Sequence, residues 1–164
     1  MADFEIQKGY IPGIIGRVAE LHALYYSRNW HFGVFFEAKV AREMAEFMDA
    51  YNSERDGLWS FSINGRIEGA IAIDGSSAQD KGAHLRWFIV SDNLQGKGAG
   101  KILINEAVSF CKSKQYKKVY LWTFDGLLPA RHLYEKAGFR LVEENTGTKW
   151  GKEVTQQKFE IRLP

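Results

Sequence analysis

Three glycines in the run Gln95-Gly96-Lys97-Gly98-Ala99-Gly100-Lys101 constrain the fold of this chain more than any other feature. The apolar stretch Leu85 to Val90 before the run is typical of a strand, and the stretch Ile102 to Phe110 after it is typical of a helix. A helix start exposes unpaired backbone N–H groups and the positive end of the helix dipole, and glycines let a phosphate approach that main chain without a Cβ in the way. The sequence therefore predicts an anion-binding turn between a strand and a helix.

The spacing of the glycines distinguishes between known phosphate-binding loops. The P-loop of nucleotide hydrolases needs glycine where this chain has Gln95, and serine or threonine where it has Ile102. The dinucleotide-binding pattern G-x-G-x-x-G fits Gly96 and Gly98 but needs its third glycine at Lys101. The run instead matches the pattern Gln/Arg-x-x-Gly-x-Gly/Ala.

With the strand that ends in Phe88-Ile89-Val90-Ser91-Asp92, this run resembles the loop of the GNAT acyltransferases, which binds the pyrophosphate of acetyl-CoA. A second segment, Ala130 to Phe139, is similar to the late helix of that superfamily, written A-x-x-L-Y-x-x-x-G-F. The resemblance extends from about Trp59 to Phe139 and is weaker in the first third of the chain. The segment Thr148 to Phe159 also resembles acetyltransferase domains fused to bacterial MarR-type regulators, and only the transferase half of such fusions is implied here.

Length and composition predict a single domain over residues 1–164, and the resemblance implies that it is an N-acetyltransferase domain. The chain has 164 residues, 45% hydrophobic and 26% charged, which is typical of a globular domain. Its apolar runs are shorter than the roughly 18 to 20 residues that a membrane span requires, so we expect no membrane partner. The segment Met1 to Glu5 lacks the features of a secretory leader, which favours a cytoplasmic location. A formal net charge of +2 is too small to indicate nucleic-acid binding.

Hydrophobic periodicity predicts an α+β fold with about four helices and a mixed, mostly antiparallel sheet of about six or seven strands. The expected strands cover residues 4–10, 58–63, 67–73, 84–90, 118–124, 139–144 and 154–162. The expected helices cover residues 13–28, 35–51, 98–114 and 129–137. The dipeptide Asn64-Gly65 predicts a tight hairpin turn, because both residues tolerate positive φ. The resemblance implies the three-layer α/β/α GNAT fold, in which two central strands splay apart.

The resemblance also implies acetyl-CoA as co-substrate, with no metal, and places the pantetheine arm between the two splayed strands. The residues expected to bind the cofactor are Phe88, Ile89, Val90, Gln95, Gly96, Lys97, Gly98, Ala99, Gly100 and Lys101. The first three would act through their main chain, since an unpaired strand edge suits an amide-bearing arm, while their side chains are expected in the core. The two lysines either neutralise phosphate or lie solvated at a helix start. Many relatives have asparagine where this chain has Leu127, so that cofactor contact is lost or replaced.

Acyl transfer to an amine needs an acid for the departing thiolate and a base, or a chain of waters, for the ammonium group. The resemblance implies that Tyr134 is the acid, and the alternative is a core tyrosine whose hydroxyl bonds elsewhere. The base candidates are His84, which shares a strand face with Phe88, and Glu37, which lies among aromatic residues at a helix start. Each equally suits an ordinary structural role. Cys111 falls in the helix after the loop, so no covalent route through it is expected.

The predicted function is an N-acyltransferase that moves an acetyl group from acetyl-CoA directly to a primary amine in a ternary complex. The acceptor is a small molecule or a peptide, and its predicted site contains Trp30, Phe35, Trp122, Thr123 and Phe124. The aromatic residues between positions 25 and 36 equally suit a core or a homodimer surface. The alternative function is a non-catalytic acyl-CoA sensor or interaction module.

Overall fold

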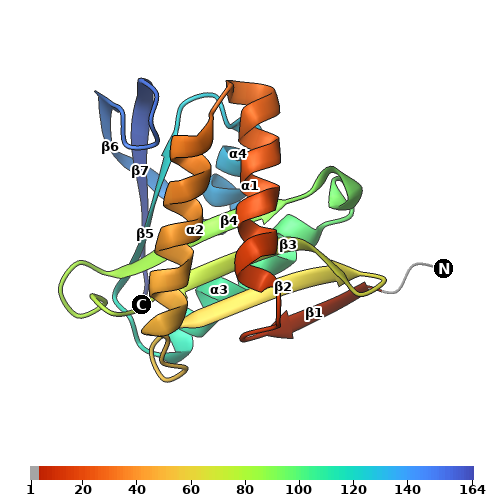
Figure 1. Cartoon of the computed structure of the whole chain (residues 1–164). Coiled ribbons are helices and arrows are strands. Elements are labelled where there is room, and N and C mark those ends of the chain that lie inside the picture. The colour runs from red at the N-terminus through yellow and green to blue at the C-terminus, as the bar shows by residue number, and fades with distance from the viewer. Residues whose placement is uncertain (1–3) are drawn as a thin grey trace.

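The computed structural model describes residues 4–164, where four α-helices pack on the two faces of a seven-stranded sheet (Figure 1). In chain order the elements are β1 (Phe4–Lys8), α1 (Ile14–Trp30), α2 (Val34–Asp49), β2 (Gly57–Ile63), β3 (Arg66–Asp74), β4 (Ala83–Val90), α3 (Ala99–Ser113), β5 (Lys118–Phe124), α4 (Leu128–Ala137), β6 (Arg140–Gly147) and β7 (Val154–Arg162). Residues 1–3, part of the segment considered for a secretory leader, lie outside the described residues. Within residues 4–164 no helix combines the length and the apolarity needed to cross a membrane.

The sheet confirms the predicted mixed, mostly antiparallel arrangement. Its strand order is β1-β2-β3-β4-β5-β7-β6, and β4 and β5 form the parallel pair. The hairpin between β2 and β3 turns at Asn64 and Gly65, whose φ angles are 50° and 81°. The glycine and asparagine at that turn are needed because both positions have positive φ.

Strand β3 explains why helices cover both faces of the sheet. Its side chains alternate, so Ala70 and Ala72 pack with residues of α1 and α2, whereas Ile71 and Ile73 pack with residues of α3. A strand that is apolar on both faces needs a layer on each side. The three-layer α/β/α architecture predicted by the resemblance is therefore confirmed.

The two central strands separate after a short parallel contact. Strand β4 pairs with β5 only at Ala83 and His84, toward the start of β4. On its other edge, Arg86 of β4 faces Ala72 of β3 and Ile89 faces Ala70, so β4 carries one extra residue at that point. Trp87 lies in this bulge with a φ of 48°. The bulge and the short pairing leave the second half of β4 unpaired along the edge that faces β5.

Element bounds differ from the predicted ones mainly where local chemistry gives a weak signal. Helix α1 continues to Trp30 and ends at His31, which adopts a left-handed conformation with φ of 58°. Strand β6 continues to Gly147, beyond the predicted end at residue 144. A short 3-10 helix, Asp92–Leu94, lies between β4 and the glycine run.

Candidate active site

The glycine run forms an open turn at the start of α3. Gly96 and Gly98 have φ angles of 75° and 79°, and no atom lies within 4 Å of the position that a Cβ would occupy on either residue. Gly98 is the N-cap of α3, and no side chain of residues 4–164 caps the helix. The first N–H groups of α3 therefore remain available to an anion, as the sequence predicts.

Gly100 has a different structural role from the two glycines before it. A Cβ on Gly100 would lie 2.9 Å from Leu133 Cδ1 and 3.3 Å from Phe88 Cζ. Because Leu133 belongs to α4 and Phe88 to β4, Gly100 lets these two elements approach the start of α3 closely. The third glycine is thus required by packing beside the loop.

A groove of about 360 Å³ runs from the turn along the unpaired part of β4. Its lining residues are Tyr25, Tyr26, Phe88, Ile89, Val90, Leu94, Gln95, Gly96, Gly98, Ala99, Gly100, Lys101, Leu127, Pro129, Ala130 and Leu133. These include nine of the ten residues predicted to bind the cofactor. The tenth, Lys97, turns its Nζ toward the ring of Phe4, 5.7 Å from the ring centroid. The shape of the groove and the open glycine turn fit an extended ligand that ends in phosphates.

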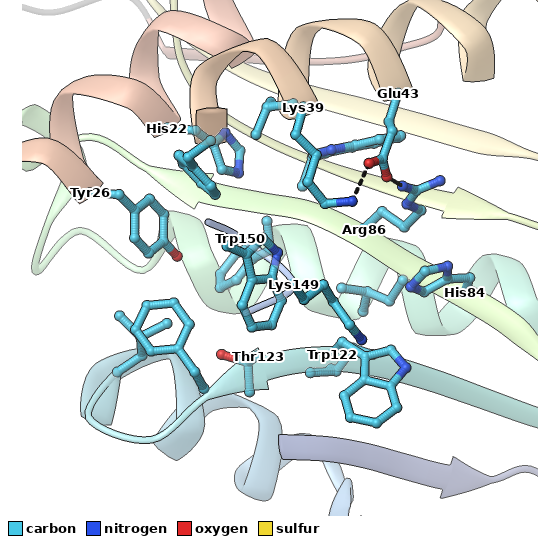
Figure 2. A pocket seen from close by; sticks show the side chains of 18 of the residues that line it. His22, Tyr26, Lys39, Glu43, His84, Arg86, Trp122, Thr123, Lys149 and Trp150 are labelled. Atoms are coloured by element: carbon cyan, nitrogen blue, oxygen red, sulfur yellow. Dashed lines mark hydrogen bonds and ion pairs between the residues drawn. The ribbon is translucent and has the colours of Figure 1, made fainter. Parts of the chain in front are cut away.

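A second cavity, of about 180 Å³, adjoins the groove on the side of α2 (Figure 2). Tyr134 lines this second cavity, and Tyr26, Phe88 and Leu127 line both spaces. The two spaces therefore meet at the point where β4 and β5 separate. A ligand in the groove and a second ligand in the cavity would come into contact beside Tyr134.

Tyr134 is held by aromatic packing. Its ring centroid lies 5.8 Å from that of Phe88 and 6.1 Å from those of Phe139 and Phe159. The residue is only 6% exposed, and its hydroxyl forms no hydrogen bond with any of residues 4–164. Burial raises the pKa of Tyr134 above its ordinary value, so the hydroxyl keeps its proton at neutral pH.

Two histidines line the second cavity, and only His84 was predicted. Burial, followed by the charge of Arg86, lowers the pKa of His84 to about 3, and its ring stacks on Tyr120 at 4.5 Å between centroids. Burial lowers the pKa of His22 to about 4. Its Nδ1 lies 2.8 Å from the carbonyl oxygen of Val18, and since a carbonyl only accepts, Nδ1 carries the proton and Nε2 has the lone pair. Both imidazoles are neutral at pH 7.

The acceptor residues predicted from the sequence divide into two groups. Trp122, Thr123 and Phe124 line the second cavity. Trp30 lies behind it, edge-on to Phe124 at 4.9 Å between ring centroids. Phe35 is 58% exposed, and like Trp30 it does not line the second cavity.

Glu37 is exposed on the first turn of α2 and lies outside the residues that line the second cavity. The face of α2 that reaches the cavity contains Phe36, Lys39, Val40 and Glu43. Their spacing of three, four and seven residues marks one helix face, and this signal in the sequence could have identified Lys39 and Glu43. Lys39 and Glu43 were not predicted, because the helix was recognised from its apolar residues alone.

Further lining residues that were not predicted include Tyr26, Arg86, Lys149 and Trp150. Arg86 follows His84 by two residues on the strand face toward α2, where it bonds Glu43, so the period of two could have identified it. The prediction that His84 shares this face with Phe88 is wrong, because the bulge at Trp87 breaks the alternation and turns Phe88 to the α3 side together with Leu85. Lys149 and Trp150 come from the connection between β6 and β7, and the sequence gives no local signal for their place at the cavity.

Leu127 is the residue at which the resemblance implies that an asparagine contact is lost or replaced. Its side chain is 7% exposed and packs in an apolar cluster that includes Phe36, Val40 and Phe124. Because Leu127 lines both spaces, their junction is apolar at this residue. Leu127 therefore offers an apolar side chain, and no polar side-chain atom, at this junction.

Comparison with solved structures places this fold in one class. The fold matches that of a GNAT-family acetyltransferase from Staphylococcus aureus Mu50 with a TM-score of 0.76 at 18% identity, over 99% of this chain and all of the other. It also matches that of an acetyltransferase from Salmonella typhimurium, solved with its cofactor acetyl-CoA, with a TM-score of 0.75 at 13% identity. That match covers 98% of this chain and 94% of the other.

The sequence gives the family. Residues 17–139 match the model of the acetyltransferase (GNAT) family, and this chain belongs to that family. Human N-acetyltransferase 8B is 21% identical over 153 residues, which are 91% of this chain and 67% of the human protein. An uncharacterised N-acetyltransferase of Methanocaldococcus jannaschii is 24% identical over 124 residues, 73% of this chain and 55% of its own length. The chain thus spans roughly half to two thirds of the length of these relatives.

Proposed function

We propose that this chain transfers an acetyl group from acetyl-CoA to the amine of a small molecule or peptide, directly within a ternary complex. The observation that carries the proposal is the junction of the two spaces beside Tyr134, where Tyr26, Phe88 and Leu127 line both. Two ligands that meet at one buried hydroxyl suit direct transfer better than a covalent route. Cys111 does not offer such a route, since burial raises the pKa of its thiol to about 12.

The glycine turn and the edge of β4 would hold acetyl-CoA, which supplies the activated acetyl group. Backbone N–H groups at the start of α3 bind its phosphates, and the unpaired main chain of Phe88, Ile89 and Val90 offers hydrogen bonds to the amides of its arm. Lys101 lies at the turn and adds positive charge near the phosphates. Family membership and the acetyl-CoA bound to the Salmonella neighbour support this assignment.

Tyr134 acts as the general acid in this proposal. Its hydroxyl is protonated, buried and without a hydrogen-bond partner among residues 4–164, so it holds a proton for the departing thiolate. Among the predicted bases, His84 lines the acceptor cavity and Glu37 lies outside it. Burial lowers the pKa of His84 to about 3 and of His22 to about 4, which makes both imidazoles weak bases, so we place proton removal at water that their neutral lone pairs orient.

The test of the cofactor site compares two glycines of the same conformation. Gly98 and Gly13 are both left-handed N-caps, with φ of 79° and 93°, and both have open space where a Cβ would lie. Gly98→Val and Gly13→Val should therefore destabilise the fold to a similar degree. In calorimetric titrations with acetyl-CoA and with free CoA, we expect Gly98→Val alone to weaken binding at least tenfold. Equal affinity in the two variants would remove the turn from the cofactor site.

A non-catalytic acyl-CoA sensor is the alternative that the titration leaves open, and amine-dependent release of thiol decides between the two functions. The similarity of the C-terminal segment to MarR-fused domains, the cytoplasmic location and a homodimer stay predictions.

A further inference from the structure

The acceptor cavity contains more positive than negative charge. Within the described chain its charged lining residues are Lys39, Arg86 and Lys149, which are cationic, and Glu43, which is anionic. Glu43 accepts hydrogen bonds from both Lys39 and Arg86, and dashed lines mark both in Figure 2. Arg86 also lies 3.8 Å from the carboxylate of Asp74. Lys39 and Arg86 therefore have carboxylate partners, and the unmatched charge is that of Lys149.

Aromatic rings, and no carboxylate, hold Lys149 at the cavity. Its Nζ lies 3.6 Å from the centroid of the Trp122 ring and 5.6 Å from that of Trp150. No carboxylate of residues 4–164 forms an ion pair with its Nζ, and the charges of Glu143 and Glu43 act on it only from a greater distance. The backbone N–H of Lys149 donates to the side-chain oxygen of Gln156 at 3.0 Å, which fixes the connection that carries the lysine. Lys158 adds a second cation 6.0 Å from the Trp122 ring.

We propose that the acceptor amine also carries a carboxylate, and that Lys149 binds this carboxylate while the amine points toward Tyr134. The inference rests on the proposed function, because it specifies the acceptor of that reaction. In Figure 2, Lys149 and Arg86 lie on one side of the cavity and Tyr26 on the other, so the charged groups gather at one end. A carboxylate at that end forms a charge-assisted hydrogen bond with the free ammonium of Lys149.

Acceptors of other charge fit this cavity less well. A polyamine would place further ammonium groups beside Lys39, Arg86 and Lys149, and like charges at short distance repel. An apolar amine without a carboxylate would pack against the rings of Tyr26 and Phe36 but would provide no negative charge for Lys149.

The test uses pairs of amines that differ only in the carboxylate, titrated into the protein in the presence of free CoA. The first pair is L-phenylalanine and 2-phenylethylamine, and the second is 6-aminohexanoate and hexylamine, so the acid lies near to the amine or far from it. The variants are Lys149→Gln and, as control, Lys152→Gln, whose lysine is exposed three residues further on. We expect the wild type and the control to bind the carboxylate member of at least one pair roughly tenfold to a hundredfold more tightly than its partner. Lys149→Gln should remove that preference.

The results separate this inference from the reaction itself, because binding does not require turnover. Equal affinity for both members of each pair, the same preference in Lys149→Gln as in the wild type, or no binding of either carboxylate would overturn the inference. Equal acetylation of both members would support the transferase and still overturn the carboxylate assignment. Selective binding that depends on Lys149, without acetylation of any probe, would support the carboxylate assignment and contradict the proposed reaction.

Discussion

Replacing Tyr134 with phenylalanine removes one hydroxyl and keeps the packing around the ring. The contacts with Phe88, Phe139 and Phe159 involve the ring alone, and the hydroxyl has no hydrogen-bond partner among residues 4–164. The substitution therefore leaves no orphaned polar group, and the melting temperature should change little. The free energy of unfolding of Tyr134→Phe, compared with that of the wild type, tests whether the fold is equally stable.

The catalytic loss in Tyr134→Phe should be large and confined to turnover. General acids contribute roughly a hundredfold to ten-thousandfold in rate. Because the residue is only 6% exposed, water has little access to replace the lost hydroxyl. We expect kcat to fall at least ~100-fold, about 2.7 kcal/mol in the barrier, while the KM for acetyl-CoA stays within about twofold.

Steady-state thiol release at saturating acetyl-CoA measures both constants. Tyr10→Phe, which removes the hydroxyl of a tyrosine that is 60% exposed, is the matched control and should have wild-type kcat. A kcat of Tyr134→Phe equal to that of the control would remove Tyr134 from the mechanism.

Two further predictions concern packing and pH. In Gly100→Ala, the new Cβ would lie 2.9 Å from Leu133 Cδ1, so the end of that side chain must shift, while the helix propensity of alanine offsets part of the cost. We therefore expect the two sites to be coupled: Leu133→Ala should cost less stability in Gly100→Ala than in the wild type, as measured by urea unfolding, and strictly additive costs would refute the close approach. The folded-state pKa of His22, about 4, lies below its ordinary value of 6.5, so the unfolded chain binds the extra proton and stability falls as pH drops from 6.5 toward 4, by up to about 1.4 kcal/mol per unit. His22→Gln should lose less stability over that window, and an identical pH dependence in both proteins would contradict the assignment.

Helices and strands were predictable where burial follows a simple period. Ile14, Val18 and Leu21 recur at spacings of three and four, and all three are buried on one face of α1. The hairpin at Asn64 and Gly65 was predictable because two consecutive residues must adopt positive φ. Local rules of this kind determine most of the element order.

The bulge in β4 was not predictable from such rules. Trp87 has positive φ although tryptophan gives no signal for that conformation. Its backbone is set by pairing with β3 on one edge and by the separation from β5 on the other. Tertiary structure therefore decides where the strands separate, and the family resemblance supplied that expectation.

The cofactor groove was more predictable than the acceptor cavity. Most of the groove lining comes from one stretch, residues 88–101, whereas the cavity joins side chains from α1, α2, β4, β5 and the connection between β6 and β7. Lys149 reaches Trp122 across more than twenty positions of sequence, and only the pairing of β5 with β7 brings the two together. Gly100 was assigned to the phosphate turn, and its contact with Leu133 depends on where α4 packs.

Amine-dependent release of thiol from acetyl-CoA tests the central claim most directly. The purified chain is incubated with acetyl-CoA and with each amine of the matched pairs, and free thiol is followed against a reaction without amine. The account predicts release that depends on both the amine and the hydroxyl of Tyr134. Binding of acetyl-CoA without release for any acceptor would contradict the transferase and support the sensor.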